Sequence, residues 1–424
     1  MADTGKIAEV LFENAIDTYE DQTQLVEKTT VFEPNAENMQ NAGNFVWRPV
    51  QQHAPVIEGW DLTGQETGII EETYPAILGT PKNDFVKQRA DDLRDMTFWE
   101  RRGKQSGRQQ ATELNSSIAT LIKNTGSLFY RSNATSGYNF VAEGQALLNE
   151  RQAVADDRCF VLNDRDTLTY ASDLAARQTL QGRPETTWKT GQIGQNVAEF
   201  DLYTGSYLPN LVGGADPATT VTADQSFAPQ GGTVDATTGI VTNFDYRSAT
   251  IPVAASAAYN VGDKISIANG GTTVKSIGLA DKNETNQAMT FTVVAKPSGT
   301  SLTIYPKPIA LDDPGLSVLE KAYANINTQI LNTATVNRLN IDASAKTNLF
   351  WAKDSIEVVG GSIPANLFSQ FSGNKVVTSR LKSGLDMYMV YDGDIDDMTF
   401  RFRLFTWYGL TNCNPSANGV AVSF

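Results

Sequence analysis

The sequence predicts an α+β fold into which an all-β barrel is inserted, and three observations support this prediction. Apolar residues recur at helical spacing over Gln105–Lys123, which is typical of a long packed helix. Phenylalanines alternate with arginines over Thr399–Trp407, which indicates a half-buried strand. Leucine is absent between Leu211 and Leu279, where Thr, Ala, Gly and Ser replace the good helix formers.

The first element is expected to be an amphipathic helix over about Gly5–Gln24. Its apolar residues share one broad face, and the opposite arc is acidic, with Glu9, Glu13, Asp17 and Glu20. Two interpretations stay open: the charge stripe is a solvated helix face, or it is a docking strip for a basic partner. A terminal helix also needs another surface against which to bury its apolar side.

The next segment, Thr30–Lys82, is rich in proline and is expected to form an extended arm and a long hairpin. Short strands are expected at Asn44–Val50 and Ile69–Tyr74. A projecting loop of this kind usually has a binding or assembly role.

Residues Asp84–Ser127 are expected to be helical, and their first part carries charges of alternating sign. One interpretation is a helix surface with (i, i+4) ion pairs, each worth about 0.3–0.5 kcal/mol. The other is a set of salt bridges to neighbouring copies of the chain. The residues that would make such bridges are Arg89, Asp91, Asp92, Arg94, Asp95, Arg101 and Arg102.

Short elements are expected on both sides of the predicted barrel. Those before it are helices at Gln145–Asp157 and Leu168–Leu180, and strands at Cys159–Leu162 and Val197–Tyr203. The barrel itself is expected over Ala218–Leu311, because alternating strand patterns there are separated by turns that contain Gly and Asn. A long helix is then predicted over Leu316–Asn340, followed by strands at Met387–Tyr391 and Thr399–Trp407.

Composition excludes several classes of function. Lys and Arg total 34 and Asp and Glu total 48, for a formal charge of −14. So acidic a chain cannot release many phosphate counterions to bind nucleic acid over a broad face. One histidine and two cysteines, Cys159 and Cys413, are too few for a zinc, haem c or four-cysteine iron–sulfur site. We expect both thiols to be buried and reduced.

The sequence shows no secretory signal and no apolar run of about 20 residues, so we expect a protein that is made and kept soluble. It also lacks a G-x-G-x-x-G after a strand, a G-K-[ST] phosphate loop and a G-x-S-x-G turn. Its histidine, His53, lies in the proline-rich arm, which is not expected to hold catalytic geometry.

The acidic run Asp392–Asp397 is similar to the start of a calcium loop. Its sixth position is Asp397, where Gly is required, and its twelfth is Arg403, where Glu is required. An acidic hairpin tip is therefore favoured over a metal site. We expect no catalytic residue, no cofactor and no metal.

Nine short stretches point to a family by their number and order. They are EGWDLT (58–63), NDF (83–85), QRADDLRD (88–95), NFVA (139–142), YPKPIALDD (305–313), AYANINT (322–328), FWA (350–352), IPAN (363–366) and WYG (407–409). Through them the chain resembles the major capsid (coat) proteins of tailed double-stranded-DNA bacteriophages, in the short-tailed branch typified by the Salmonella phage coat protein. The resemblance covers nearly the whole chain and is weakest across Ala215–Asp245.

The resemblance implies the tailed-phage major capsid fold with an inserted telokin-like β-barrel domain. The implied divisions are an N-terminal arm with its amphipathic helix (1–49), an extended loop and following helix (50–98), a peripheral domain with a spine helix (99–138), the first part of an axial domain with a β-hinge (139–217), the inserted barrel (218–311), and the second part of the axial and peripheral domains (312–424).

The resemblance also implies a function, which is self-assembly into the pentamers and hexamers of an icosahedral procapsid and mature head that encloses the phage double-stranded DNA. The implied partners are further copies of the chain, a scaffolding protein and a portal complex, with assembly in the host bacterial cytoplasm. The scaffold is expected to contact Glu13, Asp17 and Glu20. A loop within Gly231–Asp245 is expected to reach a neighbouring capsomer, through Asp235 and Asp245.

Three alternatives stay open. A cellular nanocompartment shell on the same fold would have a packaged enzyme in place of a scaffold and portal. An acidic hydrolase with a carboxylate pair would show a saccharide-dependent rate, although spacing nominates no pair. A β-rich surface adhesin is suggested by the Thr-rich middle segment, but the missing export signal argues against it.

Overall fold

The structure is a computed structural model, and it describes most of the chain. The residues outside the description are 1–3, 35–38, 40–42, 51–52, 57, 62, 64–67, 90, 92–94, 133–136, 153–155, 178–191, 215–218, 230–232, 235–240, 243–244, 341–342, 373–374, 395, 397 and 424. Two compact units are present. The first unit is Met1–Val46, Ala76–Ile118 and Ile356–Thr411, and the second unit is Trp47–Pro75, Ala119–Ser355 and Asn412–Phe424.

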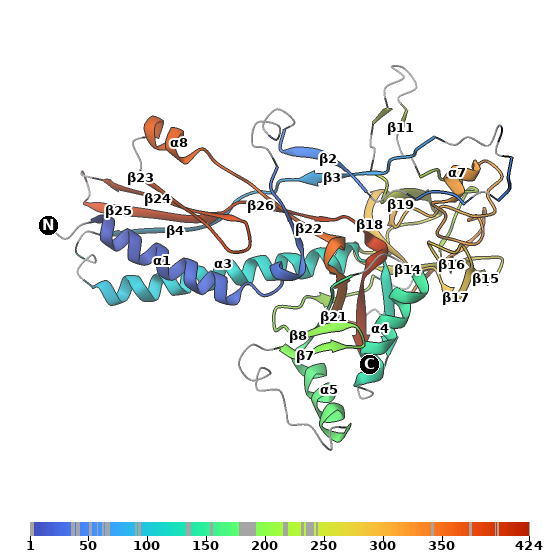
Figure 1. The fold of residues 1–424 in the computed structure, drawn as a ribbon, viewed down its shortest axis with the longest axis horizontal. Coiled ribbons are helices and arrows are strands. Elements are labelled where there is room, and N and C mark those ends of the chain that lie inside the picture. Colours follow the sequence, from blue (N-terminus) through green and yellow to red (C-terminus); the bar gives the residue numbers. More distant parts are fainter. Residues whose placement is uncertain are drawn as a thin grey trace. The chain divides into compact units, whose positions relative to one another are not determined.

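In the first unit, two helices and a four-stranded antiparallel sheet form the main elements (Figure 1). The helices are α1 (Thr4–Gln22) and α3 (Met96–Thr125), of which the end of α3 belongs to the second unit. The sheet has the order β23 (Lys375–Arg380), β24 (Asp386–Asp394), β25 (Thr399–Thr406) and β4 (Lys82–Arg89), and the short helix α8 (Ala365–Ser372) precedes β23.

The strand predicted from alternating Phe and Arg is confirmed. The side chains of Phe400, Phe402 and Leu404 are buried, whereas Arg401 is half-buried and Arg403 is exposed. The rings of Phe400 and Phe402 lie 5.2 and 5.5 Å from the ring of Trp99 on α3. One face of the sheet is therefore held on the helix by aromatic packing.

The predicted helix over Asp84–Ser127 is wrong at its beginning. Residues Lys82–Arg89 form β4, which pairs with β25 from Arg89 opposite Thr399 to Lys82 opposite Thr406. Burial along β4 alternates with period two, so the charged residues spread over both faces of a strand. Pairing with β25 supplies eight residues with backbone partners, and this tertiary gain outweighs the local helical pattern.

Smaller sheets complete the strands of the first unit, and the β2–β3 pair divides between the first and the second unit. After η1 (Val26–Lys28), β1 (Thr30–Phe32) pairs in parallel with β22 (Ile356–Gly360), and β26 (Tyr408–Asn412) lies on the other side of β22. The strands β2 (Phe45–Pro49) and β3 (Thr73–Ile77) pair as the two legs of the proline-rich arm. The N–H of Val50 donates to the carbonyl of Glu72 at 2.9 Å beyond the end of β2.

The second unit contains a mixed sheet with two helices, α4 (Tyr138–Arg151) and α5 (Asp164–Arg177). The sheet has the order β5 (Leu128–Ser132), β27 (Asn418–Ser423), β21 (Ala345–Ala352), β6 (Arg158–Leu162), β8 (Phe200–Thr204) and β7 (Gln192–Val197), with β9 (Asn210–Leu211) on β21. Its core is aromatic: the rings of Phe160 and Phe350 stack at 5.8 Å, with Phe140 and Phe200 edge-on to Phe160.

The same unit contains the predicted all-β barrel. Its antiparallel strands have the order β10 (Thr219–Thr220), β20 (Thr335–Arg338), β14 (Lys264–Asn269), β18 (Phe291–Ser298), β19 (Ser301–Tyr305) and β13 (Ala249–Pro252), with β15 (Thr272–Thr273) on β14. The two edge strands meet, because Ala254 N–H donates to Thr220 O at 2.9 Å and Thr222 N–H donates to Pro252 O at 3.1 Å. The sheet thus closes on itself around a core of aliphatic and aromatic side chains.

The predicted long helix over Leu316–Asn340 is wrong. The helix α7 (Val318–Lys321) lasts one turn, with a capping box between Ser317 and Glu320, and Thr335–Arg338 forms β20. The apolar side chains that suggested a helical stripe, such as Ile326 and Ile330, are buried in the barrel core. The barrel sheet consequently extends beyond Leu311.

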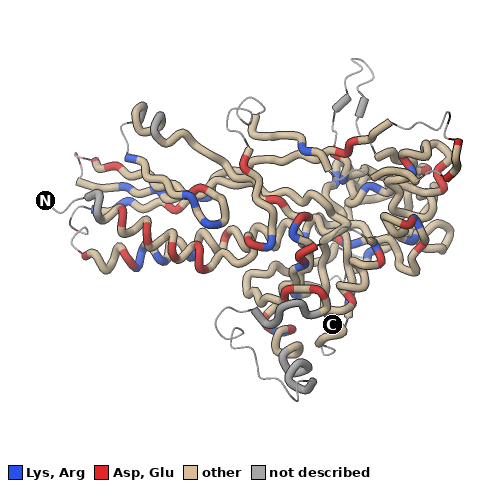
Figure 2. Tube along the Cα trace, in the orientation of Figure 1, with Lys and Arg blue, Asp and Glu red and all other residues tan. Residues whose placement is uncertain are grey.

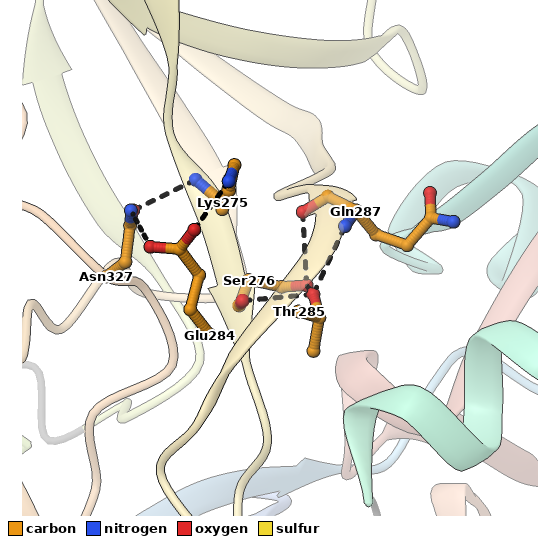
Figure 3. A network of polar contacts seen from close by, with 6 residues as sticks. All are labelled: Lys275, Ser276, Glu284, Thr285, Gln287 and Asn327. Atoms are coloured by element: carbon orange, nitrogen blue, oxygen red, sulfur yellow. Dashed lines mark hydrogen bonds and ion pairs between the residues drawn. The ribbon is translucent and has the colours of Figure 1, made fainter.

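Two hairpins complete the second unit: β11 (Thr233–Val234) with β12 (Val241–Thr242), and β16 (Lys275–Ile277) with β17 (Glu284–Ala288). Figure 3 shows how polar side chains tie the second hairpin together. The ammonium of Lys275 pairs with the carboxylate of Glu284 at 2.5 Å, and Asn327 Nδ2 donates to the same carboxylate at 2.9 Å. Ser276 and Thr285 join their hydroxyl groups at 2.6 Å on the other side.

Both cysteines, Cys159 and Cys413, are buried free thiols, as predicted. Among the helices that the structure describes, none is long and apolar enough to cross a membrane.

Candidate interaction surfaces

The helix α1 lies directly on α3, and two glycines of α3 allow the close approach. A Cβ atom on Gly103 would lie 2.5 Å from Leu11 O, and one on Gly107 would lie 2.2 Å from Ala15 O. The apolar face of α1, with Ile7, Leu11, Ala15 and Tyr19, is buried as predicted. The orientation of α1 on the first unit is therefore fixed by backbone contact.

The opposite face of α1 carries the acidic arc, and Figure 2 shows acidic positions recurring along this helix. The side chains of Glu9, Glu13 and Asp17 are exposed. Glu20 is different, because its carboxylate pairs with the Lys382 ammonium at 2.7 Å and accepts the Lys382 N–H at 3.0 Å. These hydrogen bonds from Lys382 lower the pKa of Glu20.

The structure thus separates the three acids that were predicted to bind a scaffold. Glu13 and Asp17 are four residues apart, so they project side by side from one exposed helix face. Glu20 lies on the same helix, but it has a partner in its own chain. Two neighbouring like charges on a fixed helix face can accept a basic segment without rearrangement of the backbone.

The alternating charge run divides between β4, the following turn and α3. The structure places Arg89, Asp91, Asp95 and Arg101 at exposed positions, whereas Asp92 and Arg94 lie outside the described residues. Arg101 Nε donates to Thr97 O at 3.3 Å, and Asp95 Oδ1 accepts the Thr97 N–H at 3.0 Å at the start of α3. The expected contacts with neighbouring copies stay a prediction.

Arg102 of the same run has a partner within its chain. Its guanidinium donates to both oxygens of Asp84, at 2.6 and 2.7 Å, and the Ser106 hydroxyl donates to Asp84 at 2.5 Å. This fork ties α3 to β4. It is an ion pair between a helix and a strand, not the (i, i+4) pair that a continuous helix would have made.

Asp245, predicted as an inter-capsomer residue, is bound by Arg247. The guanidinium donates to the two carboxylate oxygens at 2.8 Å each, and both side chains are largely buried. Burial opposes the charge on Arg247, but the hydrogen bonds from its side chain to Asp245 raise the pKa of Arg247 above its usual value. Asp235 lies outside the described residues.

The acidic run Asp392–Asp397 begins within β24, whose last residues include Asp392 and Asp394. Asp392 pairs with Arg401 at 3.2 Å, and Asp394 Oδ1 accepts the Asp396 N–H at 3.1 Å. Asp397 lies outside the described residues. Among the residues that are described, no group of three or more acids, histidines or cysteines is placed to hold a metal ion.

Sequence reasoning missed a polar cavity of about 90 Å³ in the second unit. It is lined by residues that include His53, Glu72, Lys307 and Tyr323. The Tyr323 hydroxyl accepts the His53 N–H at 3.1 Å and donates to Ile70 O at 2.7 Å, so one side chain joins both legs of the proline-rich arm. The His53 ring lies edge-on to Tyr323 at 5.1 Å, and burial, with the charge of Lys282, lowers the pKa of His53.

No local signal could have identified this arrangement. His53 precedes Tyr323 by 270 residues, and the tyrosine lies in a segment that was predicted to be helical. The arm is therefore anchored on the part of the chain that contains the barrel, and His53 has a structural role at the anchor point.

Comparison with known proteins identifies the family. The family model described as "P22 coat protein - gene protein 5" matches residues 1–423. Among solved structures, the capsid of the cyanophage P-SCSP1u is similar with a TM-score of 0.45 and 9% identity, over 94% of this chain and 86% of that chain. The Mycobacterium phage Che8 chain has a TM-score of 0.39 and 10% identity, over 91% and 88% of the two chains.

A third similarity is confined to part of the chain. The CUS-3 coat protein I-domain is 29% identical over 30% of this chain and 98% of that chain, with a TM-score of 0.22. The family assignment rests on the family model, which spans nearly every residue. The chain therefore belongs to the P22 coat protein family, and it is a major capsid protein that forms a phage shell.

Proposed function

We propose that the chain assembles into the pentamers and hexamers of an icosahedral procapsid, in the host bacterial cytoplasm, under the direction of a scaffolding protein. The procapsid then matures into the head, whose assembly includes a portal complex and which encloses double-stranded DNA without sequence-specific binding. The formal charge of −14 supports the role of a container, because an acidic wall repels phosphate and does not trap the genome. We propose no enzymatic activity.

We further propose that the chain belongs to the short-tailed, Salmonella-phage-like branch and that its barrel is the telokin-like insertion of that branch. The closed barrel in the second unit supports this proposal, since it lies where the composition changes along the sequence. In the same terms α1 is the N-terminal arm, β2 and β3 are the legs of the extended loop, and α3 is the spine helix of the peripheral domain.

The observation that carries the scaffold proposal is the exposed pair Glu13 and Asp17 on a helix whose other face is fixed on α3. A basic helical segment of the scaffolding protein would meet two carboxylates of known orientation. Such contacts are screened by salt, with a Debye length of about 8 Å at physiological ionic strength. Modest, reversible contacts of this kind let misplaced subunits leave before the shell closes.

The test is a double charge reversal, Glu13→Lys with Asp17→Lys. We expect the variant to lose binding to the scaffolding protein in a pull-down and to form no closed particles by negative-stain microscopy after co-expression. The circular dichroism spectrum and the urea midpoint of the monomer should be unchanged, because both side chains are exposed.

A matched control reverses two exposed acids of α4, Glu143→Lys with Glu150→Lys, which changes the net charge by the same amount. This control should assemble normally. Scaffold binding that survives in the α1 variant, or that is lost equally in the α4 control, would contradict a role for this face.

We also propose that the segment Gly231–Asp245 reaches a neighbouring capsomer. Its ends are held by the pairing of β11 with β12. Because Asp245 is bound by Arg247 in its own chain, an ion pair to a neighbour through Asp245 would have to replace that contact. Asp235, the other proposed member, lies outside the described residues. The exposed charges Arg89, Asp91, Asp95 and Arg101 are proposed as further inter-subunit contacts.

A further inference from the structure

The first residue of the barrel strand β14 is a lysine with no exposure to solvent. The Lys264 side chain is fully buried, and its ammonium donates to three uncharged oxygens. These are Lys123 O at 2.9 Å, Gly126 O at 2.5 Å and Thr292 Oγ1 at 2.9 Å. A buried ammonium is costly unless its donors are satisfied, so this arrangement calls for a physical explanation.

The positions of the acceptors explain why the lysine is buried here. Lys123 O belongs to the last turn of α3, and Gly126 O directly follows its last residue, Thr125. The last carbonyls of a helix have no partner within the helix, and the end of the helix carries a partial negative charge. Burial lowers the pKa of Lys264 well below its usual value, and its amino group satisfies these carbonyls through the hydrogen bonds that it donates. The Thr292 hydroxyl of β18 also donates to Gly126 O, at 2.5 Å, so two barrel strands contribute to the same helix end.

The backbone of Lys264 is held in place by its neighbours. The Lys264 N–H donates to Asn340 Oδ1 at 2.9 Å, and Asn340 Nδ2 donates to Asp263 Oδ1 at 3.0 Å. Asp263 is itself fully buried and accepts the Asn260 N–H at 2.8 Å. The strand therefore presents the backbone of Lys264 at a fixed position, so that only the lysine side chain has to be ordered to reach the helix.

Other donors of the barrel segment also bind backbone carbonyls that lie outside the barrel. Leu279 N–H donates to Arg151 O at the end of α4, at 3.1 Å. Arg247 donates to Asn412 O at 2.6 Å, and the neighbouring Tyr246 hydroxyl donates to Cys413 O. The barrel segment thus supplies donors to carbonyls at the end of α4, at the end of β26 and at Cys413.

We propose that Lys264 is a positioning residue that caps α3 from the inserted barrel, so that the last turn of α3 opens only together with the barrel. The capping donor comes from 141 residues away along the chain, and α3 has no such donor of its own at these carbonyls among the described contacts. The stability of the last turn of α3 then depends on the barrel. This device acts within one subunit and is independent of scaffold binding.

The test is hydrogen–deuterium exchange on the full-length monomer of Lys264→Met, which keeps the length of the side chain and removes the donors. We expect exchange over Ile118–Gly126 to rise by about tenfold or more, because leaving buried carbonyls without their donor shifts the local opening equilibrium by that order. Exchange in α1 should be unchanged. The matched control is Lys296→Met, since the Lys296 ammonium donates to Tyr259 O within the barrel.

Two results would overturn the proposal. One is exchange at the end of α3 that is the same in Lys264→Met as in Lys296→Met. The other would be seen in Thr292→Val, a nearly isosteric variant that keeps Lys264. This variant also provides the test if Lys264→Met does not fold. Thr292→Val should produce a smaller increase that is confined to the same turn, and an increase spread evenly over the barrel would mean that the two residues only fill its core.

Discussion

At the scale of single residues, Glu72 is a buried acid in a cavity that also holds cations. Its side chain is 7% exposed and lines the cavity with His53 and Lys307. Burial raises the pKa of Glu72 to about 8, although the charges of Lys307 and Lys282 oppose the shift. The native state therefore binds this proton more tightly than the unfolded state does.

The sign of the pH dependence follows. The contribution of Glu72 to stability is fully present below the usual carboxyl pKa of about 4.3 and is lost as the pH rises through about 8. We expect Glu72→Gln to remove this loss, so that the stability of the variant relative to the native chain increases between pH 5 and pH 8 and then levels off. The slope is at most about 1.4 kcal/mol per pH unit. Urea unfolding across this range measures it.

The neighbouring acid provides the control for Glu72. Glu71 is exposed, and Glu71→Gln is the matched loss of one acid at the adjacent position. A pH-dependent difference of the same size in this variant would contradict the assignment to Glu72. Lys282 and Lys307 are coupled to Glu72, so the difference between the two curves reports the glutamate together with its effect on these two lysines. A difference that stays constant from pH 5 to pH 8 would show that Glu72 is ionised in the native state.

At the scale of elements, local periodicity predicted those parts of the fold whose patterns reflect their burial. The helix α1 and the strands β24 and β25 were predicted because their alternation or helical spacing is uninterrupted. The strand β4 and the segment around β20 were predicted as helices, since neither sequence shows which partner strand supplies its hydrogen bonds. Short-range patterns cannot encode a partner strand that lies far away along the chain.

The candidate site shows the same limit. The exposure of Glu13 and Asp17 follows from the helical wheel of α1, and the structure agrees with it. The pairing of Glu20 with Lys382 spans 362 residues and has no local signature. The buried Lys264 is the extreme case, because an alternating strand pattern places a lysine at the surface until the end of α3 is known to lie beside it.

The contact of α1 with α3 gives a prediction at this scale. Gly107→Ala should loosen α1, because the new Cβ would lie 2.2 Å from Ala15 O, and the gain in helix propensity of about 1 kcal/mol is too small to offset a clash with backbone. We expect faster proteolysis within α1 and a lower urea midpoint. Gln109→Ala, at an exposed position of the same helix, should be neutral. Equal protection of α1 in both variants would show that the helices adjust without cost.

At the scale of the whole molecule, the contacts that keep the chain folded are buried, and the charges proposed for assembly are exposed. Buried polar contacts, such as those of Lys264, Arg247 and Tyr323, connect segments that are distant in the sequence and hold the second unit together. The exposed charges on α1, β4 and the start of α3 are those that we propose for contacts with other molecules. A shell protein needs this separation, because assembly contacts must be weak and reversible while the subunit stays folded.

Shortening the loop between β11 and β12 would test whether assembly contacts can be removed without a loss of subunit stability. Val234 and Val241 face each other as the last residue pair of the hairpin, so residues 235–240 can be replaced by a two-residue Asn-Gly turn. We expect the monomer to keep its urea midpoint and the assembled shell to dissociate at a lower temperature, because the change removes only the proposed contact with a neighbouring capsomer. Gly270→Asn, in the exposed turn between β14 and β15, is the control and should leave the shell unchanged. If shells that lack the loop dissociate at the same temperature as native shells, this segment has no part in holding capsomers together.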